Sequence, residues 1–389
     1  CTEYSIRRNT ETERKKRELR TCILKRKRRK QKRRALLAII LVVLVLVSLP
    51  FVFALYGRHQ MRKIPSMSFA EVLEYSTRDN EEARITVGVI ENDRSTFTVY
   101  GENGRESAPE ILPYEIGSLS KTFTAGCIMK AAREGRLDLE AGIDAYLSLP
   151  EKEHYPTILD LMTHSSGYKA WYFQAPMIGN FFTGRNSFCG ISKDRLLQKV
   201  ASVDIPDEEH PFVYSNFGYA VLGLLTEAVY GSEFPSIINH FIQDDLGLRN
   251  TCLPDGENGL PNGWEWQEGD AYQAAGAVIS DIRDMLRYAE MLMEDSEFLD
   301  GCCEPLKEIS SSPKDYELLD IRMDAIGAGW IFDRENGIIW HNGGTGHYNA
   351  YLGFHPESET AVVVLSNLPP HYRVPATILG IKKLRELIG

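Results

Sequence analysis

The pattern of apolar and polar positions divides the chain into sheet-forming ends and a helical middle. Residues 85–91 and 96–100 are rich in β-branched and aromatic side chains, and the four polar residues between them predict a hairpin turn. Four more short strands separated by turn residues are expected at residues 329–333, 337–341, 348–354 and 360–366. We expect strands from both ends to share one sheet.

The middle of the chain favours helices instead. Residues 118–134, closed by Gly135, carry few charges before their last turn, which is typical of a helix buried on most sides. Further helices are predicted at residues 158–163, 193–200, 218–229, 235–246, 282–294 and 375–387. Sheet-forming ends around a helical middle predict an α+β architecture, an antiparallel sheet flanked by helices with an inserted helical subdomain.

An uncharged run of 21 residues, 35–55, lies ahead of the sheet-forming part. A helix needs about 20 apolar residues to cross a bilayer, so the run predicts one transmembrane helix. The 34 residues before it hold 16 Lys and Arg against 4 Asp and Glu, whereas the rest of the chain holds 28 against 50. Because basic residues keep their side of a span in the cytoplasm, the part after Tyr56 is expected outside the cell membrane.

These features predict four parts: a basic cytoplasmic segment (1–34), a signal anchor in the lipid bilayer (35–56), a linker (57–67) and one large domain (68–389). The alternative is a cleaved signal peptide that releases a soluble enzyme. A signal peptide has a shorter apolar core and a small-residue cleavage site, so the uncleaved anchor is favoured. The basic stretch is explained by topology and lipid-surface charge, and no nucleic acid partner is expected. The oligomeric state is not indicated.

Neither a metal nor a cofactor is expected. The seven cysteines show no metal-ligand spacing, and the chain has neither a His-Glu-x-x-His site nor a Gly-x-Ser-x-Gly elbow.

The pattern Ser-x-x-Lys occurs three times, beginning at Ser118, Ser166 and Ser311. Only the first copy opens a strong helical pattern, because a glycine and a proline interrupt the other two. On a helix Ser118 and Lys121 share one face, and the helix dipole favours an oxyanion at the serine. Desolvation would lower the pKa of Lys121 and let it accept the serine proton. A serine helix cap beside a solvated lysine is the alternative.

Tyr214-Ser215-Asn216 precedes a second helix start. A tyrosine close to a lysine can have its phenolate stabilised and act as a base, and an asparagine amide can hold a substrate carbonyl. The alternative is a turn tripeptide that caps the helix.

A third group, His341-Asn342-Gly343-Gly344, follows an apolar strand. Glycines at a strand edge let a substrate backbone approach closely and leave N–H groups to donate. The alternative is a loop that joins two strands.

In chain order, SLSK at 118–121, YSN at 214–216 and HNG at 341–343 resemble the three active-site motifs of the serine β-lactamase and penicillin-binding-protein superfamily, nearest to its class C β-lactamase and D,D-peptidase branch. The flanking words EIGSLSKTFTA, LMTHSSG and AAGAVIS strengthen the likeness, which covers residues 68–389. The resemblance implies a β-lactamase/transpeptidase-like fold and acyl transfer without a metal.

The resemblance also implies a role for each residue. Ser118 attacks a carbonyl to form an acyl-enzyme, Lys121 and Tyr214 manage its proton, and Asn216 steadies the substrate amide. The N–H groups of Ser118 and Gly344 form the oxyanion hole, which stabilises the tetrahedral state.

His341 marks a departure from the family pattern, because the best-known members carry Lys-Thr-Gly where this chain has His-Asn-Gly. A permanent positive charge becomes a titratable one, so the strand of His341 and Gly343 should anchor a substrate carboxylate less firmly. If His341 replaces the lysine, activity on carboxylate-bearing substrates should rise as it protonates, near or below pH ~6.5. Related branches with His in that place include esterases and peptidases that act on D-amino acids.

The predicted function is a membrane-anchored, extracytoplasmic serine hydrolase. Its substrate would be a small molecule or peptide with a reactive carbonyl: a β-lactam, a D-amino-acid peptide or an ester. Two alternatives stay open, a D-alanyl-D-alanine carboxypeptidase of cell-wall metabolism and a non-catalytic membrane receptor for wall fragments that signals through the basic segment. Rapid turnover of an acyl-enzyme would argue against the receptor.

Overall fold

The computed structural model describes residues 61–254, 260–294, 297–309 and 313–389, together with residues 30, 44, 45, 48, 49 and 57. The chain divides into two units, Cys1–Ile64 and Pro65–Gly389, and the second contains the sheet and its helices. The predicted basic segment and membrane anchor lie almost wholly outside the described residues. Within the part of the chain that is described, no helix is both long enough and apolar enough to cross a bilayer.

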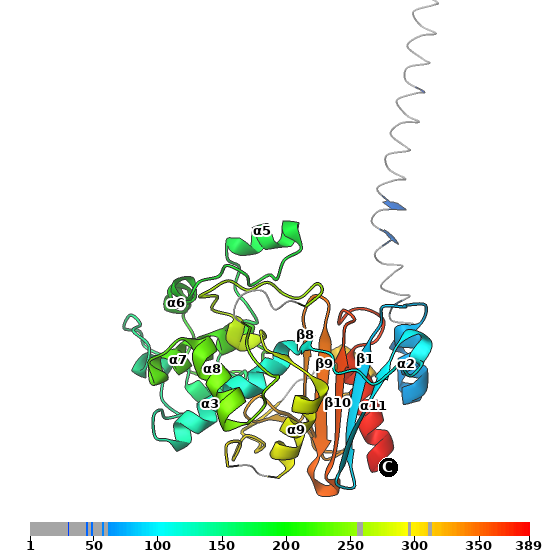
Figure 1. The fold of residues 1–389 in the computed structure, drawn as a ribbon. Helices are drawn as coiled ribbons and strands as arrows, with labels where there is room; N and C mark the ends of the chain where they lie inside the picture. Colours follow the sequence, from blue (N-terminus) through cyan, green and yellow to red (C-terminus); the bar gives the residue numbers. More distant parts are fainter. Residues whose placement is uncertain are drawn as a thin grey trace, which may run out of the picture. The chain divides into compact units, whose positions relative to one another are not determined.

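An eight-stranded antiparallel sheet forms the centre of the second unit (Figure 1), in the order β2-β1-β10-β9-β8-β7-β6-β5. Its strands are β1 (Ile85–Glu91), β2 (Arg94–Tyr100), β5 (Lys307–Glu308), β6 (Ala325–Ile326), β7 (Ile331–Asp333), β8 (Ile338–Gly344), β9 (Asn349–His355) and β10 (Thr360–Ser366). Strand β1 pairs with β10 along its length, so the prediction that strands from both ends share one sheet is confirmed. A separate pair consists of β3 (Tyr114–Glu115) and β4 (Ile279–Ser280).

The β1–β2 hairpin turns more tightly than its sequence predicts. Glu91 pairs with Arg94, so only Asn92 and Asp93 form the loop. Both have positive φ, 53° and 60°, as a two-residue hairpin turn that follows the twist of the strands requires. Asn and Asp tolerate this backbone region better than other side chains, which explains why the tight turn forms here without glycine.

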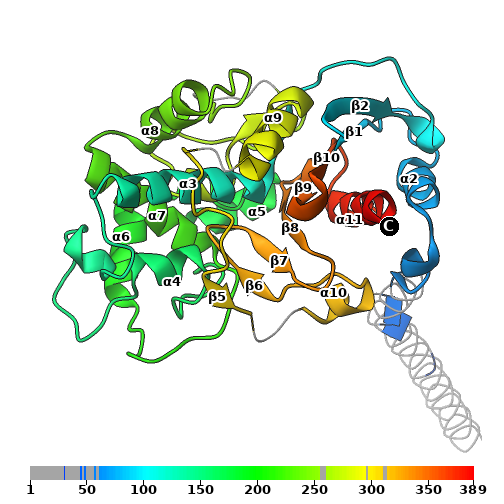
Figure 2. The ribbon, with the colours of Figure 1, turned by 90° about the horizontal axis from the view of Figure 1, so that it is seen from below.

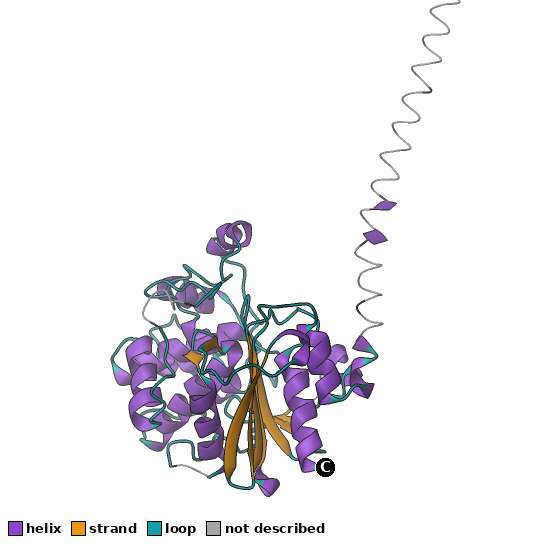
Figure 3. Cartoon of the chain, turned by 45° about the vertical axis from the view of Figure 1, so that its right-hand side comes forward, coloured by secondary structure: helices purple, strands orange, loops and turns teal. Residues whose placement is uncertain are grey.

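Helices cover both faces of the sheet (Figure 3). Helix α9 (Ile282–Met293) packs on one face and α11 (Ala376–Ile388) on the other, with β9 and β10 between them (Figure 2). Every residue of β10 is buried, which its run of β-branched residues permits because neither face meets water. Helix α2 (Phe69–Thr77) packs beside α11 and begins with a Ser68–Glu71 capping box, a signal present in the sequence but not used.

The residues between β2 and β5 form the helical part, as predicted. Its helices are α3 (Ser120–Arg133), α4 (Ile158–Met162), α5 (Pro176–Thr183), α6 (Lys193–Ser202), α7 (Asn216–Tyr230) and α8 (Phe234–His240). The helix predicted at 235–246 stops at His240 and continues as one π-helical turn, Phe241–Asp245. Helices α5 and α10 (Lys314–Leu318) were not predicted.

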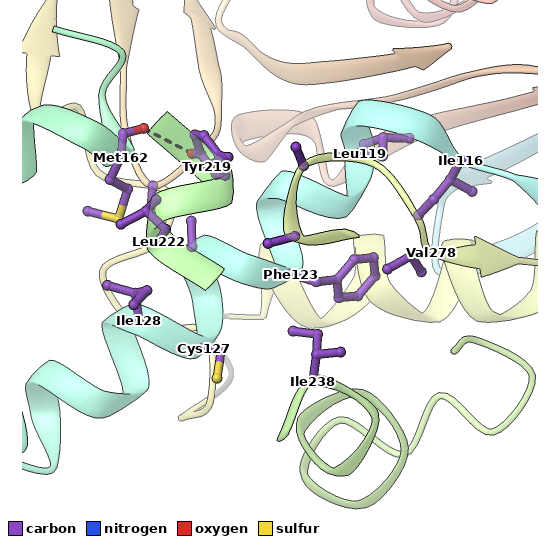
Figure 4. Close-up of a cluster of buried hydrophobic side chains, with 14 of the residues drawn as sticks. Ile116, Leu119, Phe123, Cys127, Ile128, Met162, Tyr219, Leu222, Ile238 and Val278 are labelled. Carbon is purple, nitrogen blue, oxygen red and sulfur yellow. Dashed lines mark hydrogen bonds between the residues drawn. The ribbon is translucent and has the colours of Figure 1, made fainter. Parts of the chain in front are cut away.

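Helix α3 runs through the core of the helical part and fixes everything attached to its first turn. Phe123, Cys127 and Ile128 are almost fully buried, and Leu222 of α7 and Ile238 of α8 belong to the same apolar cluster (Figure 4). A helix packed on most sides cannot shift easily, because protein interiors are close-packed. The residues at its N-terminus are therefore held in fixed positions.

Candidate active site

Ser118 lies in a 3-10 turn, Gly117–Leu119, directly before α3, rather than inside the α-helix that the sequence predicts. Gly117 has a φ of +52°, and a Cβ there would lie 2.5 Å from the Gly344 nitrogen. A Cβ on Gly343 would likewise lie 2.8 Å from the Ser118 nitrogen. Because neither glycine has a side chain, the turn that carries the serine can pack directly against the end of β8.

The amine of Lys121 is buried next to Ser118. Its Nζ lies 3.0 Å from Ser118 Oγ, 2.8 Å from Asn216 Oδ1 and 2.6 Å from the carbonyl oxygen of Ala275. Burial lowers the pKa of Lys121 well below its usual range, and none of the three partners carries a negative charge that would oppose this. A neutral amine can donate two hydrogen bonds, to Asn216 and Ala275, and accept the hydroxyl proton of Ser118 with its lone pair.

Tyr214 completes the group around the serine. Its ring centroid lies 4.9 Å from Lys121 Nζ, and its phenol is hydrogen-bonded to Ser118. Desolvation raises the pKa of Tyr214 well above its usual range, and the bond to Ser118 only partly opposes this. The phenol therefore keeps its proton at neutral pH, so the phenolate base expected from the sequence is not the resting form.

The Tyr214-Ser215-Asn216 motif both faces the serine and caps α7. Ser215 Oγ accepts the Gly218 N–H at 2.9 Å and donates to the carbonyl of Lys169 at 2.8 Å. The capping role and the contact with the Ser118 site are therefore compatible, since they use different residues of the motif.

His164 supports this motif, although the sequence analysis used it only as part of a flanking word. Its Nδ1 accepts the Ser215 N–H at 3.1 Å, and its carbonyl accepts the Val213 N–H at 2.8 Å. The imidazole ring lies 4.5 Å from the Tyr214 ring, between centroids. His164 thus holds the backbone on both sides of Tyr214.

His341 and the three residues after it are part of β8, not of a loop. The pairing of β8 with β7 ends at Trp340, whereas its pairing with β9 continues to Gly344. The strand edge of residues 341–344 is therefore left to the turn that carries Ser118. The backbone nitrogens of Ser118 and Gly344 both lie in this narrow contact between turn and strand.

His341 is neutral in the unliganded protein across the pH range in which an ordinary histidine titrates. His341 is only 3% exposed, and burial, reinforced by Lys121, lowers its pKa to about 3. Its Nδ1 lies 2.6 Å from the carbonyl oxygen of Asn342, so Nδ1 holds the proton of the neutral ring and donates it there. From the sequence, this protonation is expected near or below pH ~6.5, on the condition that His341 replaces the lysine; in the unliganded protein it lies far below that pH.

One cavity of about 270 Å³ connects these residues. The cavity is lined by Ser118, Tyr214, His341, Gly343 and Gly344. Lys121 is linked to it by its hydrogen bond to Ser118, and Asn216 by its hydrogen bond to Lys121. Much of the remaining wall is apolar: Phe212, Tyr316, Met323, Ile331, Trp340 and Pro370. Among the described residues, no Lys, Arg, Asp or Glu lines this cavity.

The site contains no cluster of metal-ligating side chains among the described residues. Within the described ranges, His, Cys, Asp and Glu form no group of three or more that could hold a metal ion. The groups around Ser118 are an amine, a phenol, an amide and backbone N–H donors, a set that can move a proton and stabilise an oxyanion.

Comparison with known sequences shows a match over most of the chain. Residues 60–381 match the family model described as Beta-lactamase. "Protein flp" of Staphylococcus aureus (strain MRSA252) is 22% identical over 282 residues, which cover 67% of this chain and 53% of that protein. A "Beta-lactamase" of Providencia stuartii is 24% identical over 232 residues, covering 54% and 55%. This chain thus spans about half the length of the curated relatives it matches.

Solved structures with the same fold cover more of this chain than the two curated relatives do. A β-lactamase/D-alanine carboxypeptidase from Yersinia pestis superposes with a TM-score of 0.66 at 19% identity, over 85% of this chain and 99% of that one. A class C β-lactamase from Rhodobacter sphaeroides gives 0.61 at 21% identity, over 84% and 99%. A penicillin-binding protein homologue from Pyrococcus abyssi, described as octameric, gives 0.62 at 23% identity, over 79% and 73%. The β-lactamase/transpeptidase-like fold implied by the motifs is confirmed.

Proposed function

This chain belongs to the β-lactamase family, and we propose that it is a serine hydrolase that forms an acyl-enzyme on Ser118. The observation that carries the proposal is the 3.0 Å contact between Ser118 Oγ and the buried amine of Lys121. A serine hydroxyl is a weak nucleophile at its usual pKa and needs an adjacent base. A lysine with a strongly lowered pKa can be that base.

In the first step Ser118 Oγ attacks the substrate carbonyl carbon while its proton moves to the lone pair of Lys121. The resulting ammonium keeps its hydrogen bonds to Asn216 Oδ1 and the Ala275 carbonyl. Because it is buried without a carboxylate, this ammonium has a lower pKa than an exposed lysine and gives the proton up again more readily. Tyr214, protonated and hydrogen-bonded to Ser118, is placed to pass a proton to the leaving group.

The negative charge of the tetrahedral intermediate falls on the former carbonyl oxygen. We assign its stabilisation to the N–H groups of Ser118 and Gly344, which the close contact between turn and strand brings together. One oxyanion-hole donor of this kind contributes about 3 kcal/mol to the transition state. Asn216 has its Oδ1 occupied by Lys121, so only its amide nitrogen remains to hold a substrate carbonyl.

The lining of the cavity favours one substrate class among the three that the motifs suggest. A carboxylate that leaves water is held most firmly by a cationic partner, and a buried charge without one is costly. No cationic side chain lines the cavity in the described part of the chain, and the pKa of about 3 keeps His341 neutral. We therefore propose neutral esters or amides as substrates, ahead of β-lactams and D-alanyl peptides, which carry a free carboxylate.

The cellular location is part of the proposal as well. The uncharged run at 35–55 behind 16 Lys and Arg supports a single-pass anchor with the cytoplasmic end first and residues 68–389 outside. Substrates would then be extracytoplasmic. A D-alanyl-D-alanine carboxypeptidase remains the second candidate, supported by the fold shared with the Yersinia pestis β-lactamase/D-alanine carboxypeptidase.

Two experiments test the proposal, one on the nucleophile and one on the substrate class. The full chain should hydrolyse an uncharged aryl ester in a reaction abolished by Ser118→Ala but kept by Ser166→Ala, which alters the serine of another Ser-x-x-Lys copy. A second set of substrates carries a carboxylate apart from the scissile bond, as a β-lactam or a D-alanyl peptide does, and each is supplied with that carboxylate free and as its methyl ester, with cleavage followed at the same scissile bond. A higher kcat/KM for the methyl ester supports the neutral class. Equal activity of wild type and Ser118→Ala would contradict the mechanism, and preference for the free acid would contradict only the substrate class.

A further inference from the structure

Exposed apolar side chains gather on α5 and the loop before it, and Figure 1 shows this helix standing out from the helical part. Phe181 and Phe182 are each 80% exposed, Phe173 is 64% exposed, and Trp171 and Ile178 are each 51% exposed. Within residues 61–389 as described, only Val213 and Leu318 are other large apolar side chains with high exposure. Single exposed apolar residues scattered over a surface are normal, whereas a contiguous group of them marks a binding surface.

These side chains form the walls of a groove of about 500 Å³. We call it the aromatic groove; its lining is completed by Met177, Ser187, Phe188 and Trp264. The one polar side chain in the lining is Ser187. The volume falls in the range of pockets that bind small molecules, and an aromatic and aliphatic lining suits a hydrocarbon or aryl group.

One wall of the aromatic groove is tied to the strand that faces Ser118. The backbone N–H of Trp264 donates to Glu115 Oε1 at 2.5 Å, and Glu115 Oε2 accepts from Thr345 Oγ1 at 2.5 Å. The indole Nε1 of Trp264 lies 3.1 Å from where a Cβ on Gly346 would be. Gly346 is two residues beyond Gly344, so this wall begins next to the proposed oxyanion hole.

The opposite wall is tied to the Tyr214-Ser215-Asn216 motif. The two residues before Trp171 use their carbonyls for this: Lys169 accepts Ser215 Oγ at 2.8 Å and Ala170 accepts the Phe217 N–H at 3.2 Å. The segment that carries Trp171 is therefore fixed to residues on both sides of Asn216. The groove and the cavity at Ser118 share no lining residue, but both Trp171 and Trp264 are attached to elements that surround Ser118, which places the groove beside the active site.

The groove is held open by contacts on the inner side of α5. Asn180 is 8% exposed, and its Nδ2 donates to the carbonyl of Cys189 at 2.7 Å and to that of Ser187 at 3.3 Å. Phe188 stacks on Tyr272 with centroids 4.3 Å apart and the rings 11° from parallel. The backbone that carries the exposed phenylalanines is thus fixed, and a ligand does not have to meet the cost of ordering that backbone.

The segment that forms most of the groove contains no acidic residue. Residues 161–193 contain no Asp or Glu, in a chain that has 54 of them. The nearby Arg185 pairs with Glu265, and Lys193 pairs with Glu227 and Glu233. Among the described residues, no charged side chain lines the groove, which suits an uncharged chain.

We propose that the aromatic groove binds the hydrocarbon or aryl tail of the acyl group whose carbonyl is attacked by Ser118. The substrate class is then esters or amides of medium- to long-chain or arylalkyl acids. This inference rests on the proposed function, because it needs the acyl carbonyl at Ser118. Each methylene that enters the groove should raise kcat/KM by up to about fourfold, the equivalent of its transfer free energy.

The test is a chain-length series of p-nitrophenyl esters, acetate, butyrate, octanoate and dodecanoate, below their aggregation limits. The full chain in phosphatidylcholine nanodiscs is compared with the double variant Phe181→Ser/Phe182→Ser, with Trp264→Ala, and with the control Leu318→Ser outside the groove. Wild type and control should prefer octanoate to acetate. Both groove variants should lose at least tenfold of that preference and keep acetate hydrolysis within twofold.

An unchanged octanoate preference in both groove variants would overturn the proposal. A different result would be that brominated phosphatidylcholine quenches tryptophan fluorescence in wild type by an amount that is absent from Trp171→Phe. That result would place Trp171 in the bilayer, assign the groove to lipid and overturn the proposal. A double variant that changes only the oligomeric state would assign the groove to a second copy, with the same consequence. Equal acetate hydrolysis by wild type and Ser118→Ala would instead show that the proposed function itself has failed.

Discussion

Lys121 Nζ lies 3.0 Å from Ser118 Oγ, and its two other hydrogen-bond partners are the neutral oxygens of Asn216 and Ala275. A lysine buried without a carboxylate loses its proton easily, because desolvation penalises the charged form. The same burial that makes Lys121 a poor contributor to stability makes it a competent base for the serine.

Replacing Lys121 with methionine should lower kcat/KM for a neutral ester by roughly 10²- to 10⁴-fold, the range typical of losing a general base. Lys121→Arg should not rescue the activity, since a guanidinium stays protonated. The control is Lys130→Met. Lys130 belongs to the same helix but lies away from the site, and its Nζ pairs with Asp245 Oδ2 at a distance of 2.5 Å. Steady-state kinetics on the three variants check this, and more than a tenth of wild-type activity in Lys121→Met would contradict it.

The pH profile should report Lys121 and not His341. Since burial lowers the pKa of Lys121, the rate should fall as the pH drops through that lowered pKa and the amine becomes protonated. His341, with a pKa of about 3, keeps one protonation state throughout the range in which a usual histidine titrates. The profile of kcat/KM for His341→Asn should therefore keep its wild-type shape. An acid limb near pH ~6.5 that disappears in this variant would restore the role first expected from the sequence.

The close contact between turn and strand should not tolerate a methyl group. Gly343→Ala places a Cβ 1.8 Å from the Ile116 carbonyl oxygen and 2.8 Å from the Ser118 nitrogen, so the turn must move away from the strand and the oxyanion donors move apart with it. We expect kcat to fall by roughly 10²- to 10³-fold with a smaller change in KM, as for loss of one oxyanion donor. Gly179→Ala is the matched control, because a Cβ there meets nothing within 4 Å. Wild-type kcat in Gly343→Ala would argue against the assigned oxyanion hole.

His164 should act as a positioning residue for Tyr214. His164→Leu removes the acceptor of the Ser215 N–H and should lower kcat roughly 10- to 100-fold, since small misplacements of reacting groups are costly. His164→Asn should recover much of the rate, because its side-chain oxygen can accept that N–H and Asn tolerates the φ of +57° found there. The comparison uses kcat and melting temperature together. A rate that follows stability alone in both variants would reduce His164 to a purely structural role.

The sequence predicted the parts of the fold whose periodicity is set by burial. Strand β10 and helix α9 fall within one residue of their predicted limits, because their apolar patterns match the faces they bury. The two-residue strands β3 and β4 are too short to leave such a pattern. The extension of β8 through Asn342, Gly343 and Gly344 runs against local strand propensity and results from pairing with β9.

The site divides in the same way. The motifs identified which side chains meet, because their order along the chain is characteristic, but they could not give the charge of His341, which depends on burial by distant segments. The support from His164 depends on a backbone contact 51 residues away in the sequence. The aromatic groove was not predicted, although the acid-free stretch at 161–193 was visible in the sequence.

The central claim is that Ser118 carries the acyl group, and intact-mass spectrometry during turnover of a slow neutral ester tests it most directly. We expect the mass of the protein to rise by one acyl group, and peptide mapping to place the adduct on Ser118. The adduct should be absent from Ser118→Ala and present in Ser166→Ala. An adduct on another residue, or an equal adduct in Ser118→Ala, would contradict the account.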